Sequence, residues 1–262
     1  MIEKKNMPTI GDSASDRSDK RKLRRFGAQH LFSHRPPYDP VFAERVPLLQ
    51  AFSLALGNYR TRLGLPAGRW AALRSVLRRR APFMAAECGV FSGSSLLACA
   101  SIARDQGVDF RFVGLDTFEG LPELSEIDKQ FAPPQASYRH RRLFTETSLE
   151  GVRQMLSTHG FSREIQLHKG LFKESIPSLE DVKYHFVNID CDLYEPHIEC
   201  LEYFYPRMIP GGIIFFDDYH SVDYPMAREA INVFMRDKPE KLNHLRYGDD
   251  GPNITKCFFI KH

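Results

Sequence analysis

The sequence predicts an α/β fold in which helices cover both faces of a doubly wound, mostly parallel sheet of seven strands. From Pro82 onward, short apolar runs typical of strands alternate with helical patterns, as a parallel sheet requires. One strand-like run ends in a glycine-containing turn that opens a helix, and two later runs end in aspartates. Open α/β folds bind ligands at the carboxyl edge of the sheet, so these strand ends predict the site.

The residues before the sheet are predicted to form two regions. Residues 1–25 hold eight Lys/Arg and four Asp/Glu without periodicity, and this composition predicts a disordered basic tail. Residues 26–81 are predicted to form an N-terminal helical cap, because segments 41–59 and 70–80 carry helical periodicity. The apolar faces of these helices are compatible with a homo-oligomer.

Residues 82–262 are predicted to form one catalytic domain. The strands are expected at 83–87, 110–116, 165–168, 185–190, 212–217, 244–247 and 256–260. The helices between them are expected at 94–105, 148–159, 196–208 and 225–235. No comparable helix separates the last two strands, so we expect an antiparallel hairpin at one edge of the sheet.

Segment 118–147 is long for a connection and rich in Arg, His and aromatic residues. Long insertions at the binding edge of a compact fold are often functional, and we predict that this segment is a lid. An ordinary surface loop is the alternative.

Composition narrows the function further. The formal net charge is +3, and residues 1–25 alone have a surplus of 8 − 4 = +4, so the rest is near neutral and does not favour nucleic-acid binding. The five cysteines are an odd number without Cys-x-x-Cys spacing, which indicates buried thiols in a reducing compartment. No apolar run approaches the roughly 20 residues that a membrane span needs, and a cytoplasmic protein is expected.

The first strand is expected to lead into a cofactor loop, Glu87-Cys-Gly89-Val-Phe-Ser-Gly93. Its Gly-x-x-x-Gly spacing fits neither the dinucleotide fingerprint nor the P-loop, so a phosphate is not the obvious ligand. Asp116 ends the next strand, where an acid can accept hydrogen bonds from ribose hydroxyls. Glu87 could approach a positively charged part of the cofactor. A cofactor with ribose, amine and sulfonium groups but no phosphate fits these positions, so the sequence predicts S-adenosylmethionine. A tight turn at the glycines and a cap at Asp116 are the structural alternatives.

The aspartates after the later strands are predicted to form a metal site. Asp190, Asp192, Asp217 and Asp218 would gather at one edge of the sheet, where like charges repel unless a cation intervenes. The neighbouring segments provide His197 and His220 but no Lys or Arg. An all-oxygen site favours Mg²⁺ or Mn²⁺, which can orient a vicinal diol and acidify one hydroxyl.

Four segments carry a family resemblance: Glu87–Ser95, Gly114–Pro122, Asp190–Tyr194 and Pro210–Tyr219. Together they resemble the macrocin O-methyltransferases, metal-dependent enzymes that use S-adenosylmethionine to methylate sugar hydroxyls of macrolide and aminocoumarin natural products. The similarity runs from Pro82 to the C-terminus. It implies a Rossmann-like class I methyltransferase fold and an O-methyltransferase whose acceptor is a small sugar or glycosylated natural product.

The resemblance also implies roles for individual residues. The implied metal ligands are Asp190, Asp217 and Asp218, and the implied general base is Asp192. The implied cofactor-binding residues are Glu87, Gly89, Ser94, Asp116 and Thr117, with Ser148 on the adenine side. The chain has Cys191 and Thr117 where family members often have Gly and Ser, and neither difference removes a carboxylate.

Several alternatives remain open at this point. If the fourth strand stays extended at its end, residues two apart project to the same side, so that Asp190 holds the ion while Asp192 meets the reacting hydroxyl. His197 or His220 could be the base instead. The acceptor could be a catechol or similar phenol, and a non-catalytic scaffold that binds S-adenosylmethionine is the alternative to an enzyme.

Overall fold

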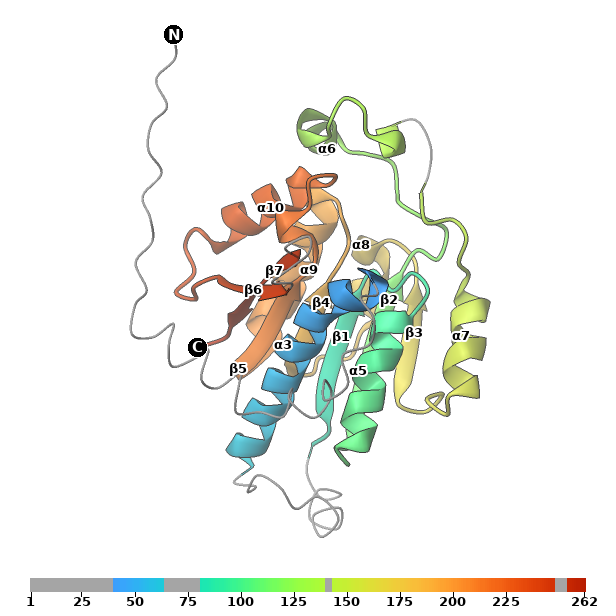
Figure 1. The fold of residues 1–262 in the computed structure, drawn as a ribbon, viewed down its shortest axis with the longest axis vertical. Helices are drawn as coiled ribbons and strands as arrows, with labels where there is room; N and C mark the ends of the chain where they lie inside the picture. The colour runs from blue at the N-terminus through green and yellow to red at the C-terminus, as the bar shows by residue number, and fades with distance from the viewer. Residues whose placement is uncertain (1–39, 64–80, 140–142, 248–253) are drawn as a thin grey trace.

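The computed structural model describes residues 40–63, 81–139, 143–247 and 254–262. A single seven-stranded sheet runs through these residues in the order β3-β2-β1-β4-β5-β7-β6 (Figure 1). The first five strands are parallel, whereas β7 is antiparallel to both β5 and β6. This is the predicted doubly wound, Rossmann-like sheet with an antiparallel hairpin at its edge.

The strands begin and end within a few residues of the predicted positions. They are β1 (Phe83–Cys88), β2 (Phe110–Asp116), β3 (Ile165–Lys169), β4 (Tyr184–Ile189), β5 (Met208–Phe216), β6 (Asn243–Tyr247) and β7 (Ile254–Ile260). The strand order reverses direction between β1 and β4, and the carboxyl ends of these neighbours form the switch point of the sheet.

Helices pack on both faces of the sheet. Alternate strand residues such as Phe83, Phe112 and Phe186 share one core with α3 (Pro40–Arg62), α5 (Ser94–Asp105) and α7 (Leu149–Thr158). The intervening residues, including Val187 and Phe216, share a second core with α9 (Tyr194–Phe204) and α10 (Pro225–Met235). The short helix α8 (Phe172–Ser175) follows β3.

Segment 118–147 has structure that the sequence did not predict. It contains α6 (Glu126–Phe131) and a short 3₁₀ helix, Ser137–Arg139. Its side chains Leu121, Ala132 and Tyr138 form a third apolar cluster with Leu193 and Met226. The segment is therefore packed against the loops that follow β4 and β5, over the carboxyl edge of the sheet (Figure 1).

The predicted tail, 1–25, and the predicted helix at 70–80 lie outside the described residues. The other predicted N-terminal helix is present as α3, which continues through Pro47. All five cysteines are buried and free. In the part of the chain that the structure describes, none of the helices has the length and apolar composition that crossing a membrane requires.

Candidate active site

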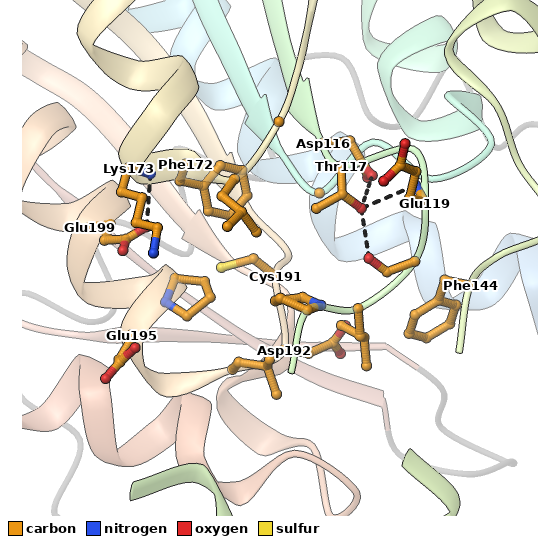
Figure 2. A pocket seen from close by; sticks show the side chains of 18 of the residues that line it. Asp116, Thr117, Glu119, Phe144, Phe172, Lys173, Cys191, Asp192, Glu195 and Glu199 are labelled. Carbon is orange, nitrogen blue, oxygen red and sulfur yellow. Dashed lines mark hydrogen bonds between the residues drawn. The ribbon is translucent and has the colours of Figure 1, made fainter. Parts of the chain in front are cut away.

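A cavity of about 720 Å³ opens at the carboxyl edge of the sheet, beside the switch point. It is lined by the loop after β1, the end of β2, the loops after β3 and β4, and part of segment 118–147. Figure 2 shows Asp116 and Thr117 on one side of this cavity and Phe172 and Lys173 on the other, with Asp192 between the two sides. The cavity therefore joins the predicted cofactor loop to Asp192, the predicted general base.

The three predicted metal ligands come together at one end of the sheet. Asp190 follows β4, and Asp217 and Asp218 follow β5; one carboxylate oxygen of each lies within 4.8 Å of the others. Burial, together with the neighbouring carboxylates, raises the pKa of Asp190 well above its usual value and that of Asp218 to about 7. Such a cluster is stabilised by a cation, and the donor set consists of oxygens, as Mg²⁺ prefers.

Asp192 lies beside this cluster but does not belong to it. The sequence predicted an extended strand end here, and the structure corrects this: β4 ends at Ile189, and Asp192 has a left-handed φ of 61°. A tight three-residue turn is closed by the N–H of Leu193, which donates to the carbonyl of Cys191 at 2.6 Å. The N–H of Asp192 donates to Oδ2 of Asp218 at 3.0 Å, which connects the predicted base to a predicted metal ligand.

A lysine contacts the acid cluster, although the sequence indicated no basic residue nearby. Lys256, on β7, forms an ion pair with Oδ2 of Asp217. Sequence reasoning missed it because β7 becomes a neighbour of β5 only through the antiparallel addition at the edge. The available signal was a lysine in an otherwise apolar strand, Lys256-Cys-Phe-Phe-Ile260.

Glu87 is buried at the end of β1, opposite Asn188 in the register of β4. The amide of Asn188 donates to Oε1 of Glu87 at 2.8 Å, whereas Oε2 of Glu87 is buried without a hydrogen-bond partner. Burial raises the pKa of Glu87 to about 8. An unpartnered buried oxygen next to the cavity end of β1 fits the ammonium group of a ligand such as S-adenosylmethionine.

Asp116 organises the loop after β1. Its Oδ2 accepts the N–H groups of Val90 and Phe91, each at 2.8 Å, and its Oδ1 accepts the N–H of Phe118 at 2.6 Å. The hydroxyl of Thr117 also lies 3.5 Å from Oδ1, but its single proton has a shorter contact with the carbonyl of Gly120, at 2.6 Å. A carboxylate offers about four acceptor positions, so the fourth is available for a ribose hydroxyl. The acid therefore caps the loop, which was the structural alternative, and also lines the cavity.

The two glycines of the loop have positive φ, 93° at Gly89 and 76° at Gly93. We expected them to let a ligand approach the backbone. Instead, the space of a Cβ at Gly89 is taken by the backbone of Asp190, and that at Gly93 by the side chains of Val152 and Met155. The glycines thus allow parts of the protein to approach each other, and of the two only Gly89 lines the cavity.

The remaining predicted cofactor residues occupy different places. Thr117 lines the cavity and donates its hydroxyl to the carbonyl of Gly120 at 2.6 Å. Ser94 begins α5 and accepts a hydrogen bond from the guanidinium of Arg45 at 2.6 Å. Ser148 is the N-cap of α7, where its hydroxyl accepts the N–H of Gly151. The cavity lining includes neither serine.

The two histidines considered as alternative bases have other partners. His197 is fully buried on α9, where its Nδ1 lies 2.8 Å from the carbonyl oxygen of Leu193, and burial lowers its pKa to about 4. His220 has its Nε2 3.0 Å from Nδ1 of His244. Among the described residues that line the cavity there is no histidine, whereas Asp192 is one of them.

Asp128 connects segment 118–147 to the segment after β4 that carries Asp192. Asp128 is a buried residue of α6, and its Oδ1 accepts the N–H of Tyr194 at 2.8 Å. Tyr194 follows Asp192 by two residues. The other oxygen of Asp128, Oδ2, accepts the N–H and the hydroxyl of Ser125. Arg139, one of the arginines of the predicted lid, donates to the carbonyls of Pro133 and Lys129 within the segment. Arg141 and Arg142 lie outside the described residues.

A family model and several curated proteins match the sequence of this chain. The family model described as Macrocin-O-methyltransferase (TylF) matches residues 69–244. A tetracenomycin-C rhamnosyl 4'-O-methyltransferase of Streptomyces olivaceus is 29% identical over 164 residues, which are 62% of this chain and 61% of the relative. The mycinamicin III 3''-O-methyltransferase of Micromonospora griseorubida is 27% identical over 165 residues, 62% of this chain and 64% of the relative. The aligned part therefore spans less than two thirds of each relative.

Solved structures share the fold. The O-methyltransferase NovP superposes on this chain with a TM-score of 0.58 at 21% identity, and the alignment covers 75% of this chain and 84% of the NovP chain. The calicheamicin methyltransferase CalS11 superposes with a TM-score of 0.59 at 20% identity and covers 99% of both chains.

Proposed function

The chain belongs to the macrocin O-methyltransferase family, and from this we propose that it methylates a hydroxyl on a sugar of a glycosylated natural product, using S-adenosylmethionine and Mg²⁺. The observation that carries the proposal is the acid cluster Asp190, Asp217 and Asp218, because one of its members, Asp190, lines the cavity that also reaches Asp116. A group of oxygen ligands for a hard cation thus lies next to a carboxylate that can bind ribose, as this reaction requires.

We assign the following roles to the residues of this chain. Asp190, Asp217 and Asp218 hold Mg²⁺, and Glu87, Asp116 and Thr117 bind the cofactor. When bound, S-adenosylmethionine supplies the methyl group and Mg²⁺ makes the acceptor hydroxyl more acidic. Asp192 would take the hydroxyl proton while the acceptor oxygen bonds to the methyl carbon, and the carbon–sulfur bond of the sulfonium would break to release S-adenosylhomocysteine. Burial raises the pKa of Asp192 above its usual value, which makes its carboxylate a stronger base.

The acceptor is proposed to be glycosylated because the aligned relatives are named for rhamnosyl tetracenomycin and mycinamicin substrates. The cavity walls are compatible with a polar acceptor, since they include Glu119, Glu123, Glu195 and Lys169. The edge-to-face pair Phe91 and Phe144, with centroids 5.5 Å apart, keeps a catechol as the second candidate.

A binding and transfer experiment tests this proposal. Calorimetry with S-adenosylmethionine, with and without Mg²⁺, measures whether the protein binds the cofactor. Methyl transfer from the labelled cofactor to matched panels of rhamnosylated and catechol acceptors then identifies the acceptor class. Transfer to the glycosides that stops in chelator supports the proposal, transfer to catechols alone favours the second candidate, and binding without any transfer favours a scaffold.

A further inference from the structure

Lys256 lies beside the acid cluster because of the strand register. In the antiparallel pair of β5 and β7, Phe216 is opposite Cys257. Asp217 follows Phe216, and Lys256 precedes Cys257. Because the two strands run in opposite directions, Asp217 and Lys256 lie on the same side of the Phe216–Cys257 pair. The lysine is therefore positioned by the sheet itself and not by a flexible loop.

The contact between the two residues is shielded from solvent. The ammonium of Lys256 is paired with Oδ2 of Asp217, and their side chains are only 15% and 24% exposed. The ion pair therefore places a positive charge next to the residues that are proposed to hold the metal.

We propose that Lys256 is the internal counter-ion of the acid cluster: it stabilises the gathered carboxylates when no metal is bound, and it weakens their affinity for Mg²⁺. This inference rests on the proposed metal site. The two effects have one cause, because an ammonium attracts the carboxylates in the metal-free protein and repels a second cation that arrives among them.

Replacing Lys256 is expected to strengthen Mg²⁺ binding, because the repulsion between the lysine and the ion is lost. The proposed ligands Asp190, Asp217 and Asp218 should stay in place, because other contacts hold them. The N–H of Asp190 donates to the carbonyl of Cys88 at 2.8 Å, and that of Asp217 donates to the carbonyl of Ile189 at 3.1 Å. Oδ2 of Asp218 accepts the N–H of Asp192 at 3.0 Å. Backbone hydrogen bonds of this kind do not depend on the lysine.

The test compares Lys256→Met with Lys256→Arg and with the control Lys238→Met, which removes a lysine paired with Asp237, a residue that is not part of the acid cluster. Calorimetry measures the Kd for Mg²⁺ alone, and thermal unfolding is measured in EDTA and in saturating Mg²⁺. We expect Lys256→Met to lower Tm in EDTA, to recover it in Mg²⁺, and to bind Mg²⁺ at least about tenfold more tightly. The arginine variant and the control should stay within about threefold of the natural protein.

The outcomes separate this inference from the proposed function. If the natural protein binds Mg²⁺ and Lys256→Met binds it equally or more weakly, the counter-ion role is wrong and the proposed function stands. If only Lys256→Met binds Mg²⁺, the counter-ion role stands and the Mg²⁺ dependence of the natural chain is wrong. If neither binds, both are wrong. Should Lys256→Met not fold, Lys256→Gln replaces it, since its amide keeps a hydrogen bond but not the charge.

Discussion

Gly89 and Asp190 meet backbone to backbone at the switch point of the sheet. A Cβ atom at position 89 would lie 1.6 Å from the carbonyl oxygen of Asp190, and the φ of Gly89 is +93°. The N–H of Asp190 in turn donates to the carbonyl of Cys88 at 2.8 Å. The end of the strand that carries Glu87 and the end of the strand that leads to Asp190, a proposed metal ligand, can lie this close only because position 89 has no side chain.

Gly89→Ala is therefore expected to destabilise the protein by more than about 3 kcal/mol, because the methyl group adds a backbone collision to the strain of a positive φ. Gly160→Ala is the matched control, since Gly160 has a φ of +76° but nothing within 4 Å of its Cβ position. The control should lose only about 1 kcal/mol. Denaturant unfolding of both variants measures the difference, and equal losses would show that the contact with Asp190 is unimportant.

Asp192→Asn is expected to lower kcat by about 10²- to 10⁴-fold, because an amide cannot take the hydroxyl proton. Asparagine is the appropriate replacement, since it tolerates the left-handed φ of 61° at this position better than alanine does. Affinities for S-adenosylmethionine and Mg²⁺ should change by less than about threefold. Steady-state kinetics and calorimetry measure both, and a variant with full kcat would exclude Asp192 as the base.

Asp190→Asn is expected to abolish Mg²⁺-dependent methyl transfer and, at the same time, to raise Tm in EDTA. The substitution removes a carboxylate whose pKa is raised by burial and by its acidic neighbours, so the metal-free protein loses a source of repulsion. Activity in Mg²⁺ and thermal unfolding in EDTA are the two measurements. A variant that lost both activity and metal-free stability would indicate a structural role instead.

Glu87→Gln tests the buried carboxyl through the pH dependence of stability. The pKa of Glu87 rises from about 4.5 to about 8 on folding, so between these values the native state binds a proton that the unfolded state has lost. The contribution of Glu87 is therefore most favourable below pH 4.5 and declines until pH 8. Relative to the natural protein, Glu87→Gln should gain stability across this range, by up to about 5 kcal/mol. Denaturant unfolding from pH 5 to 8 measures the gain, and a difference independent of pH contradicts the prediction.

Asp128→Ala is expected to raise the KM for the acceptor more than it changes the affinity for S-adenosylmethionine. The substitution removes the acceptor for the N–H of Tyr194 and releases segment 118–147 from the loop that carries Asp192. Glu126→Ala is the control on the same helix, because the side chain of Glu126 is 86% exposed. Equal KM values for both variants would mean that Asp128 only caps α6.

The sequence by itself determined the positions of the strands and the chemistry at their ends. Hydrophobic periodicity is local, so the ends of β1, β2 and β5 could be placed within a few residues, and with them Glu87, Asp116 and Asp217. Because parallel strands bring their carboxyl ends to one edge, the gathering of Asp190, Asp217 and Asp218 also followed from the pattern.

Only the tertiary structure decided which residues surround those acids. Lys256 contacts Asp217, and Asn188 contacts Glu87, through the order and register of strands that are distant in sequence. The turn at Asp192 depends on the approach of Asp218, and the contact of Asp128 with Tyr194 depends on the packing of a 30-residue insertion, 118–147. Periodicity reports which face a side chain occupies, but not which partner the fold brings to it, and these partners set the charge and the shape of the site.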